Sequence, residues 1–281
     1  MKLGGVMAYA FPGDGALDYF PCHYGTSKLM FRGPGIVPRG DYIAMLGGTE
    51  TYGKYVQHPF PAVVAEGLGL PVANLGCMNA GTDAFLRDEA VLDIAARARA
   101  VVVQIMGAQN LSNRYYTVHP RRNDRFLGAT PVLRAIFKDV DFTEFHFTRH
   151  LLTTLHATSA DRFEVIAEEL RAAWVQRMQS LLMQVPGPKV LLWMGAAPPP
   201  MPSQRADMSL HPLLVDREMI DAVRGEASVY VEVLPSPAAV GAGTEGMRFA
   251  PLEAFAASGL PGPMQHQEVG DALIAVLRKL L

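Results

Sequence analysis

The sequence predicts an α/β fold, a three-layer sandwich in which helices cover both faces of one five-stranded parallel sheet. Five short runs are rich in Val, Ile and Leu without alternating polar residues, as is typical of strands buried on both faces. Segments with helical periodicity follow these runs, and repeated strand–helix alternation builds parallel sheets. The expected strands are 42–46, 71–76, 100–107, 189–195 and 228–234.

The helices expected between and after the strands differ in length and in how they begin. The longest starts near Ser159 or Asp161 and carries apolar residues at helical spacing on one face. The helix after the second strand has Thr82 or Asp83 as its candidate N-cap, because short polar side chains accept hydrogen bonds from the first turn. The expected helices are 59–69, 82–99, about 159–185, 213–224 and 270–281.

Two regions fall outside this alternation. Residues 1–40 contain many glycines, prolines and aromatic residues, which predicts an ordered arm or cap, because disordered tails are poor in aromatic residues. Residues 108–158 form a long insertion, and connections of this length are typical of a lid, a binding element or an oligomer contact. We therefore expect an N-terminal arm, then one domain over 41–281 that carries the insertion, with homo-oligomer contacts through either decoration.

Composition and charge exclude several classes of function. The chain has 281 residues, a formal net charge of -2 and two cysteines, Cys22 and Cys77. This charge does not favour nucleic acid or an anionic membrane. The cysteines make neither a disulfide framework nor a metal-binding spacing, so we expect no metal or organic cofactor. No signal peptide or membrane-spanning run is recognisable, which predicts a soluble, cytoplasmic protein.

In doubly wound sheets, ligands bind at the carboxyl ends of the strands. The first such loop is Gly47-Gly48-Thr49-Glu50-Thr51. Its glycines permit close backbone approach, and its hydroxyl groups and free N–H groups could hold an anion or an oxyanion. Thr49 is then a nucleophile or part of an anion-binding turn; alternatively, Thr49 or Thr51 only caps the next helix.

Three further loops carry groups suited to chemistry at the same sheet edge. Gly76 and Gly81 follow the second strand, which indicates either backbone approach to a ligand or loop geometry alone. Asn110 follows the third strand, where a side-chain amide can stabilise an oxyanion or simply face solvent. His266 precedes the last expected helix, in the position that a catalytic base needs, although a lone histidine is more often incidental.

Taken together, these four loops resemble the SGNH, or GDSL-type, esterase and acyl hydrolase superfamily. In that resemblance Thr49 stands where the family has its nucleophilic serine, and His266 stands where it has its histidine. Gly81 and Asn110 correspond to the oxyanion groups, with Gly76 as a second choice for the glycine. The resemblance implies strand order 2-1-3-4-5 and a hydrolase or acyltransferase acting on an ester of a small or carbohydrate-like molecule. We also expect substrate contacts at Gly48, Glu50 and Gly76.

The sequence departs from the family pattern at the nucleophile and at the triad aspartate. Gly48 replaces the family's Asp, and the β-branched Thr49 is stiffer than serine. Pro263 stands where the family has the aspartate that orients the histidine, so the imidazole lacks that partner. These departures favour an alternative, a non-catalytic protein that binds an anion or a carbohydrate on the same scaffold. A transferase in polysaccharide metabolism is a further alternative.

The insertion holds a basic segment in which Arg121 and Arg122 lie close to Asp124 and Arg125. Guanidinium groups bind carboxylate, sulfate and phosphate well, so we expect Arg121 and Arg122 to hold an anionic part of the substrate. The alternative is a solvated loop face whose charges pair with one another.

Overall fold

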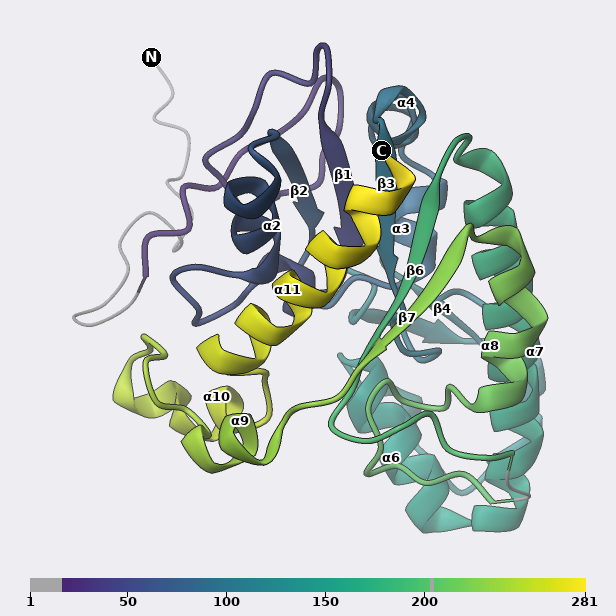
Figure 1. The fold of residues 1–281 in the computed structure, drawn as a ribbon. Coiled ribbons are helices and arrows are strands. Elements are labelled where there is room, and N and C mark those ends of the chain that lie inside the picture. The colour runs from purple at the N-terminus through teal and green to yellow at the C-terminus, as the bar shows by residue number, and fades with distance from the viewer. Residues whose placement is uncertain (1–16, 203–204) are drawn as a thin grey trace, which may run out of the picture.

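The computed structural model describes residues 17–202 and 205–281. At its centre lies a parallel sheet of five strands in the order β2-β1-β3-β6-β7 (Figure 1). In chain order this is 2-1-3-4-5, so the expected fold class and strand order are confirmed. The strands are β1 (Ile43–Gly47), β2 (Val72–Gly76), β3 (Ala100–Gln104), β6 (Lys189–Met194) and β7 (Val229–Val233).

Helices cover both faces of the sheet. Successive strand residues point to opposite sides, so apolar strands give the sheet two apolar faces to bury. Ile43 and Met45 face a core built with α2 (Phe60–Leu68) and α11 (Pro263–Leu280). Ala44 and Leu46 face the larger core on the other side. That core is built with α4 (Glu89–Arg97), α7 (Ala160–Gln184) and α8 (Arg217–Val223).

The remaining helices lie in the connections. They are α1 (Thr49–Tyr52), α3 (Thr82–Leu86), α5 (Pro131–Ile136), α6 (Thr148–Thr158), α9 (Pro237–Ala242) and α10 (Ala254–Ser258), with 3-10 turns η1 (Phe142–Glu144), η2 (Arg224–Glu226) and η3 (Pro251–Glu253).

The helix expected over 82–99 is two helices, because Asp88 starts a new one. Its side chain accepts a hydrogen bond from Val91 N at 3.2 Å, which caps α4, and Ser27 Oγ donates to it at 2.6 Å. The N-cap of α3 is Gly81, so neither Thr82 nor Asp83 caps this helix as expected. In contrast, Ser159 caps α7 as expected.

The last helix begins earlier than the sequence indicated. Gly262 is the N-cap and Pro263 the first helical residue of α11, a position where proline loses no hydrogen bond. His266 therefore lies inside α11 and not in the loop before it. Further along, α11 passes so close to α2 that a Cβ on Gly270 would lie 2.4 Å from Cγ1 of Val63.

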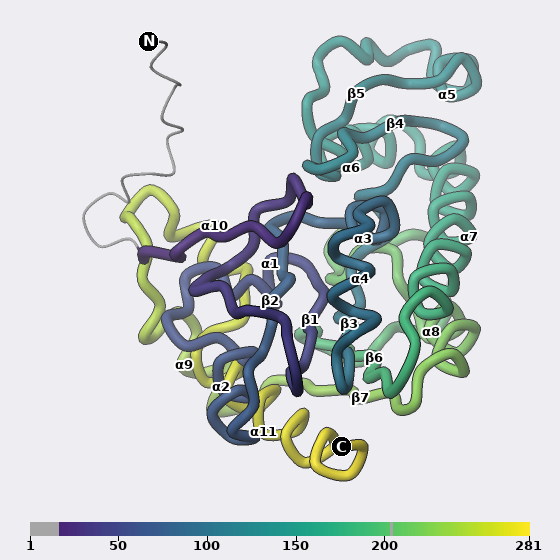
Figure 2. Tube along the Cα trace, turned by 90° about the horizontal axis from the view of Figure 1, so that it is seen from above, coloured from purple at the N-terminus to yellow at the C-terminus, as the bar shows by residue number. Residues whose placement is uncertain are grey.

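The insertion forms a small substructure of its own. Strands β4 (Tyr116–Val118) and β5 (Phe126–Ala129) pair antiparallel, and α5 and α6 follow them. Seen from above, this group projects beyond the α/β layers next to the amino-terminal half of α7 (Figure 2).

The described part of the arm, from residue 17 on, packs against the domain through buried residues such as Leu29 and Phe31. Arg32 is 7% exposed, and its guanidinium group donates to four backbone carbonyl groups that follow or end α1. Residues 1–16 of the expected arm lie outside the described residues. Among the helices that the structure describes, none is long and apolar enough to cross a membrane.

Candidate functional site

A cavity of about 850 Å³ lies at the carboxyl ends of the central strands, where the fold predicts a ligand site. The loops after β1, β2, β3 and β6 line it, together with the start of α6 and the segment that leads into α11. Its volume is within the range of small-molecule sites. The polar and charged lining residues that matter below are Gly48, Thr49, Glu50, Asn79, Gln104, Asn110, Asp124, Arg149 and His211.

The loop after β1 is fixed by the side chain of Gln104, at the end of β3. Its Oε1 accepts hydrogen bonds from Gly48 N at 3.0 Å, Thr51 N at 3.2 Å and Thr51 Oγ1 at 2.6 Å. Its Nε2 donates to Oε2 of Glu50 at 2.8 Å. One buried amide therefore satisfies the first turn of α1 and also aims the Glu50 carboxylate. The sequence hypothesis did not include Gln104.

Thr49 is the first residue of α1, and neither it nor Thr51 caps the helix; the N-cap is Gly48. The Thr49 side chain is partly exposed and lines the cavity. Its Oγ1 donates to Oδ1 of Asn79 at 3.3 Å and accepts from Asn79 N at 3.0 Å. Gly48 and Glu50 line the same cavity, so the structure brings these three predicted site residues together.

The predicted oxyanion groups are already engaged. Gly81 N donates to Oδ1 of Asn123 at 3.0 Å, and Gly81 does not line the cavity. Asn110 does line it, with Nδ2 donating to Asn79 O at 2.9 Å and Oδ1 accepting from Thr148 Oγ1 at 2.6 Å. An amide nitrogen carries two hydrogens, so Asn110 keeps one N–H for a ligand.

Gly76, the second choice for the glycine, has a packing role. A Cβ on this residue would lie 2.3 Å from the backbone nitrogen of Tyr52, so only glycine lets α1 approach β2. Its own N–H donates to Oδ1 of Asn74 at 2.9 Å. Gly76 does not line the cavity, and the structure does not support the expected substrate contact there.

His266 lies in the core between α11 and α2. It is 1% exposed, its ring stacks on Phe60, and its Nδ1 accepts the Phe60 backbone N–H at 3.1 Å. Burial, with a smaller contribution from the Arg32 charge, lowers the pKa of His266 to about 3. Among the described residues no hydrogen bond joins it to Thr49, and it does not line the cavity. The expected Thr49–His266 pair is therefore not assembled.

The histidine that lines the cavity is His211, in the loop between β6 and α8. Nη1 of Arg149 lies 2.8 Å from His211 Nε2, and Nη2 of Arg149 donates to Met208 O at 3.2 Å. Since arginine only donates, this Nε2 carries no proton. Partial burial and then the Arg149 charge lower the pKa of His211, while the Glu50 carboxylate opposes this shift. No motif in the sequence singles out His211 as a candidate site residue.

Arg121 and Arg122 lie away from the cavity. Both side chains are exposed, and the backbone N–H groups of both residues donate to Nδ1 of His119 at 3.2 Å. The cation that the insertion contributes to the cavity lining is Arg149, at the start of α6. The structure therefore brings neither Arg121 nor Arg122 to this cavity.

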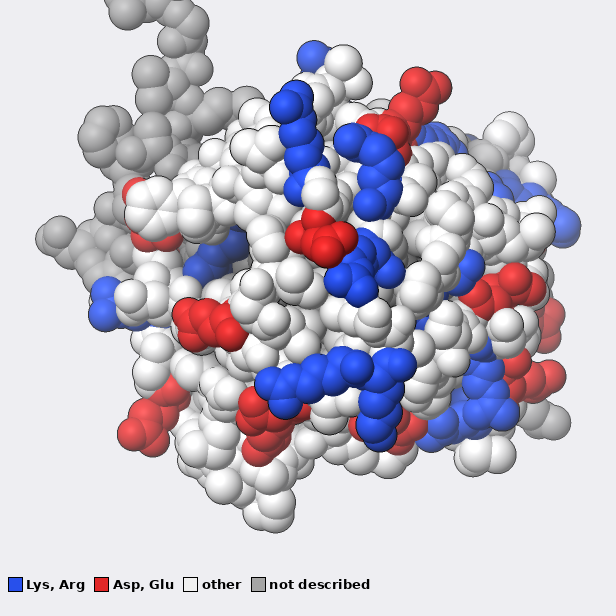
Figure 3. All heavy atoms as spheres, turned by 45° about the horizontal axis from the view of Figure 1, so that its top comes forward, with Lys and Arg blue, Asp and Glu red and all other residues white. Residues whose placement is uncertain are grey.

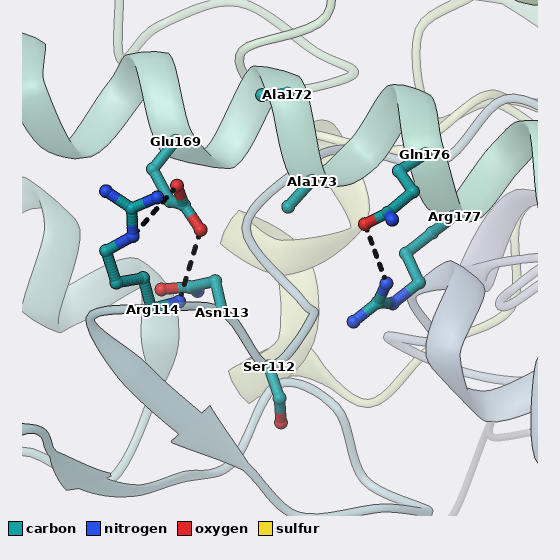
Figure 4. Close-up of a pocket in the computed structure, with 8 residues that line it drawn as sticks. All are labelled: Ser112, Asn113, Arg114, Glu169, Ala172, Ala173, Gln176 and Arg177. Carbon is teal, nitrogen blue, oxygen red and sulfur yellow. Dashed lines mark hydrogen bonds and ion pairs between the residues drawn. The ribbon is translucent and has the colours of Figure 1, made fainter.

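A second cavity, of about 710 Å³, lies between the start of the insertion and α7 (Figure 4). Its charged and polar side chains pair with one another, Arg114 with Glu169 at 3.6 Å and Arg177 with Gln176 at 3.2 Å. Arg177 also binds the buried Asp83 at 2.9 Å. The Arg114–Glu169 and Arg177–Asp83 pairs hold α7 against the domain, so we place the functional site in the first cavity.

The charges on the surface are mixed. On the face shown in Figure 3, Lys and Arg side chains alternate with Asp and Glu side chains. This distribution agrees with the small net charge and offers no extended basic field on that face.

Several solved structures resemble the chain at low sequence identity. A lipase from a goat rumen metagenome has a TM-score of 0.40 and 11% identity, and covers 84% of this chain and 97% of its own. A putative lipolytic protein of the G-D-S-L family from Desulfitobacterium hafniense has a TM-score of 0.35 and 12% identity, and the match covers 84% of this chain and 98% of that protein. A salicylyl-acyltransferase from a tetracycline biosynthetic pathway has a TM-score of 0.38 and 12% identity, and the match covers 86% of this chain and 57% of that protein. Since a shared fold does not fix function, the activity of this chain has to be argued from its own residues.

Among curated proteins, none matches the sequence significantly. The model of the family described as a domain of unknown function (DUF6473) matches residues 7–281, and the chain therefore belongs to that family.

Proposed function

We propose that the chain is a hydrolase or acyltransferase that acts on an O-acyl ester of a small or carbohydrate-like molecule, with Thr49 as nucleophile. One observation carries this proposal: the Thr49 hydroxyl group lines the cavity at the turn that leads directly from β1 into α1. The Gln104 hydrogen bonds keep that turn in place. A hydroxyl group held on such a turn is presented to a ligand without reorganisation of the backbone.

In this proposal the proton acceptor is His211 and not His266. The Thr49 oxygen attacks the acyl carbon, the hydroxyl proton passes to the neutral imidazole, and the proton then goes to the departing alkoxide. Water or an acceptor alcohol next takes the acyl group from Thr49. His211 suits the acceptor role because it lines the same cavity and its lowered pKa keeps it unprotonated at neutral pH.

Two donors are available for the oxyanion. The backbone N–H groups at the start of α1 have no partner within the helix, and Gln104 takes those of Gly48 and Thr51. The Thr49 N–H, for which the described residues offer no acceptor, therefore remains free. The second N–H of the Asn110 amide supplements it. Of the expected oxyanion groups, this proposal keeps the Thr49 N–H and Asn110 and leaves out Gly81, whose N–H donates to Asn123.

The test is cleavage of 4-nitrophenyl esters by purified protein. We expect Thr49→Ala to lose at least a hundredfold in kcat/KM, and Thr49→Ser to retain activity or exceed the parent, because serine is less hindered. Thr117→Ala, which alters an exposed threonine on β4, is the matched control. Intact-mass spectrometry should find the acyl adduct on Thr49. Full activity in Thr49→Ala would refute the proposal.

A second candidate is a non-catalytic protein that binds an anion or a carbohydrate in the same cavity. It is favoured by the partners of the Thr49 hydroxyl group, which bonds to the Asn79 amide and backbone and, among the described residues, to no imidazole or carboxylate. Saturable ligand binding to a parent protein that cleaves none of the esters would favour this candidate.

A further inference from the structure

The charged groups in the main cavity differ in how they are neutralised. Lys54 lies 3.6 Å from the Glu253 carboxylate, and the two carboxylates near Thr49 each accept a side-chain amide: Glu50 from Gln104 and Asp124 from Asn79. Arg149, in contrast, has no carboxylate partner among the residues that the structure describes. Its two hydrogen-bond partners, His211 Nε2 and Met208 O, are both uncharged.

An unneutralised guanidinium group in a cavity retains much of its binding capacity. It carries five N–H donors, and the two hydrogen bonds of Arg149 use only two of them. The remaining N–H groups suit a planar oxyanion, because a guanidinium group can bind such an ion through two parallel hydrogen bonds. Arg149 also lies in the first turn of α6, where the helix dipole disfavours a cation and favours an anion.

The carboxylates in the cavity restrict where an anion can bind. Glu50 and Asp124 lie at the Thr49 end, next to Gln104 and Asn79, and repel a negative group there. Arg149 and His211 belong to the insertion and the β6–α8 loop, which line the same cavity, and the Glu50 charge still acts on His211. Arg149 is the cation of this lining without a carboxylate partner among the described residues, so an anionic group binds best at this part of the lining, the Arg149 wall, and an uncharged ester suits the carboxylates beside Thr49.

We infer that the cavity accepts acyl esters that carry an oxyanion group, a carboxylate, sulfate or phosphate, and that Arg149 binds this group. The part of this inference that concerns an ester rests on the proposed function, whereas the binding of an anion by Arg149 does not. It also gives the ligand a second effect. An oxyanion that draws the Arg149 N–H groups away from His211 frees Nε2 of the imidazole, so substrate binding releases the proton acceptor.

The first experiment measures binding without turnover. In a Thr49→Ala background, succinate, sulfate and phosphate are titrated by isothermal titration calorimetry. We expect at least one of them to bind, with an affinity reduced ten- to hundredfold by Arg149→Gln and less by Arg149→Lys. Arg134→Gln, on α5 of the same insertion and outside the cavity lining, is the matched control. Equal affinity in Arg149→Gln, or binding of none of the three anions, would overturn the inference.

The second experiment compares two esters of equal acyl length, 4-nitrophenyl hemisuccinate and the neutral 4-nitrophenyl butyrate. We expect the ratio of their kcat/KM values to favour the hemisuccinate about tenfold or more, and the preference to disappear in Arg149→Gln. If the ratio of the two kcat/KM values were the same in Arg149→Gln as in the parent protein, the inference would be contradicted while the proposed function would stand. Binding that depends on Arg149, without cleavage of either ester, would refute the proposed function and leave the anion site intact.

Discussion

His211 and His266 are the same type of side chain in opposite surroundings. His266 is held inside the α2–α11 layer, stacked on Phe60 and acting as an acceptor for its backbone N–H. His211 lines the cavity with an arginine at its Nε2. Position along the chain favoured His266 for catalysis, whereas burial and contacts favour His211. A sequence motif thus marks where a residue sits in the chain, but the packing around it decides whether its proton can move.

The largest effect should come from replacing each of the two histidines in turn. We expect His211→Gln to lower kcat/KM by about 10²- to 10⁴-fold while changing the free energy of unfolding by less than about 0.5 kcal/mol. His266→Gln should do the reverse, destabilising the fold by about 1–3 kcal/mol while the folded protein stays active. Ester assays and urea unfolding measure both quantities. Loss of activity in folded His266→Gln would reverse the comparison.

The packing of the His266 layer can be tested separately from its histidine. Gly270→Leu should lower the free energy of unfolding by about 3 kcal/mol, because the new side chain overlaps Val63. Gly241→Leu, at a helical glycine with open space around its Cβ position, is the control and should change it by less than about 0.5 kcal/mol. Similar losses in both variants would show that close approach of α2 and α11 is not what stabilises this layer.

Acid should destabilise the fold through His266. The pKa of His266 is about 3 in the folded protein against 6.5 for an unperturbed histidine, so between these values the unfolded chain binds more protons. The neutral histidine's contribution is complete above pH 6.5 and is lost as the pH falls toward 3. We expect a loss of about 2 kcal/mol between pH 6.5 and 5, and a smaller pH dependence in His266→Gln. Chemical unfolding at several pH values tests this; an unchanged slope in the variant would assign the loss to other groups.

The smallest effect should follow from Arg121→Gln. The side chain is exposed and outside the cavity, so the free energy of unfolding should change by less than about 0.5 kcal/mol, and anion affinity should stay within twofold. Denaturant titration and calorimetry measure these changes. A clear drop in anion affinity would move the anion site from the Arg149 wall to the basic segment predicted from sequence.

The strands of the sheet were predictable because each is a short apolar run between loops and helices, whereas their order was expected only from the family resemblance. The helix boundaries were less predictable, since Asp88 and Pro263 act as helix starts through contacts and backbone geometry that periodicity does not show. The Thr49 loop was placed correctly at the sheet edge. His211 and Arg149 were missed because they lie far apart in the sequence and meet only through the β6–α8 loop and α6.

Arg32 links the arm to the loop that presents Thr49. Its guanidinium group bonds the carbonyl oxygens of Tyr52, Gly53, Val56 and Gln57, all of which follow Thr49 within eight residues. Deleting the arm would leave these acceptors without their donor, in surroundings where an unsatisfied polar group costs about 1–3 kcal/mol. A chain that lacked the arm would therefore lose the hydrogen bonds that support the turn carrying Thr49, although the described part of the arm itself contributes no residue to the cavity lining.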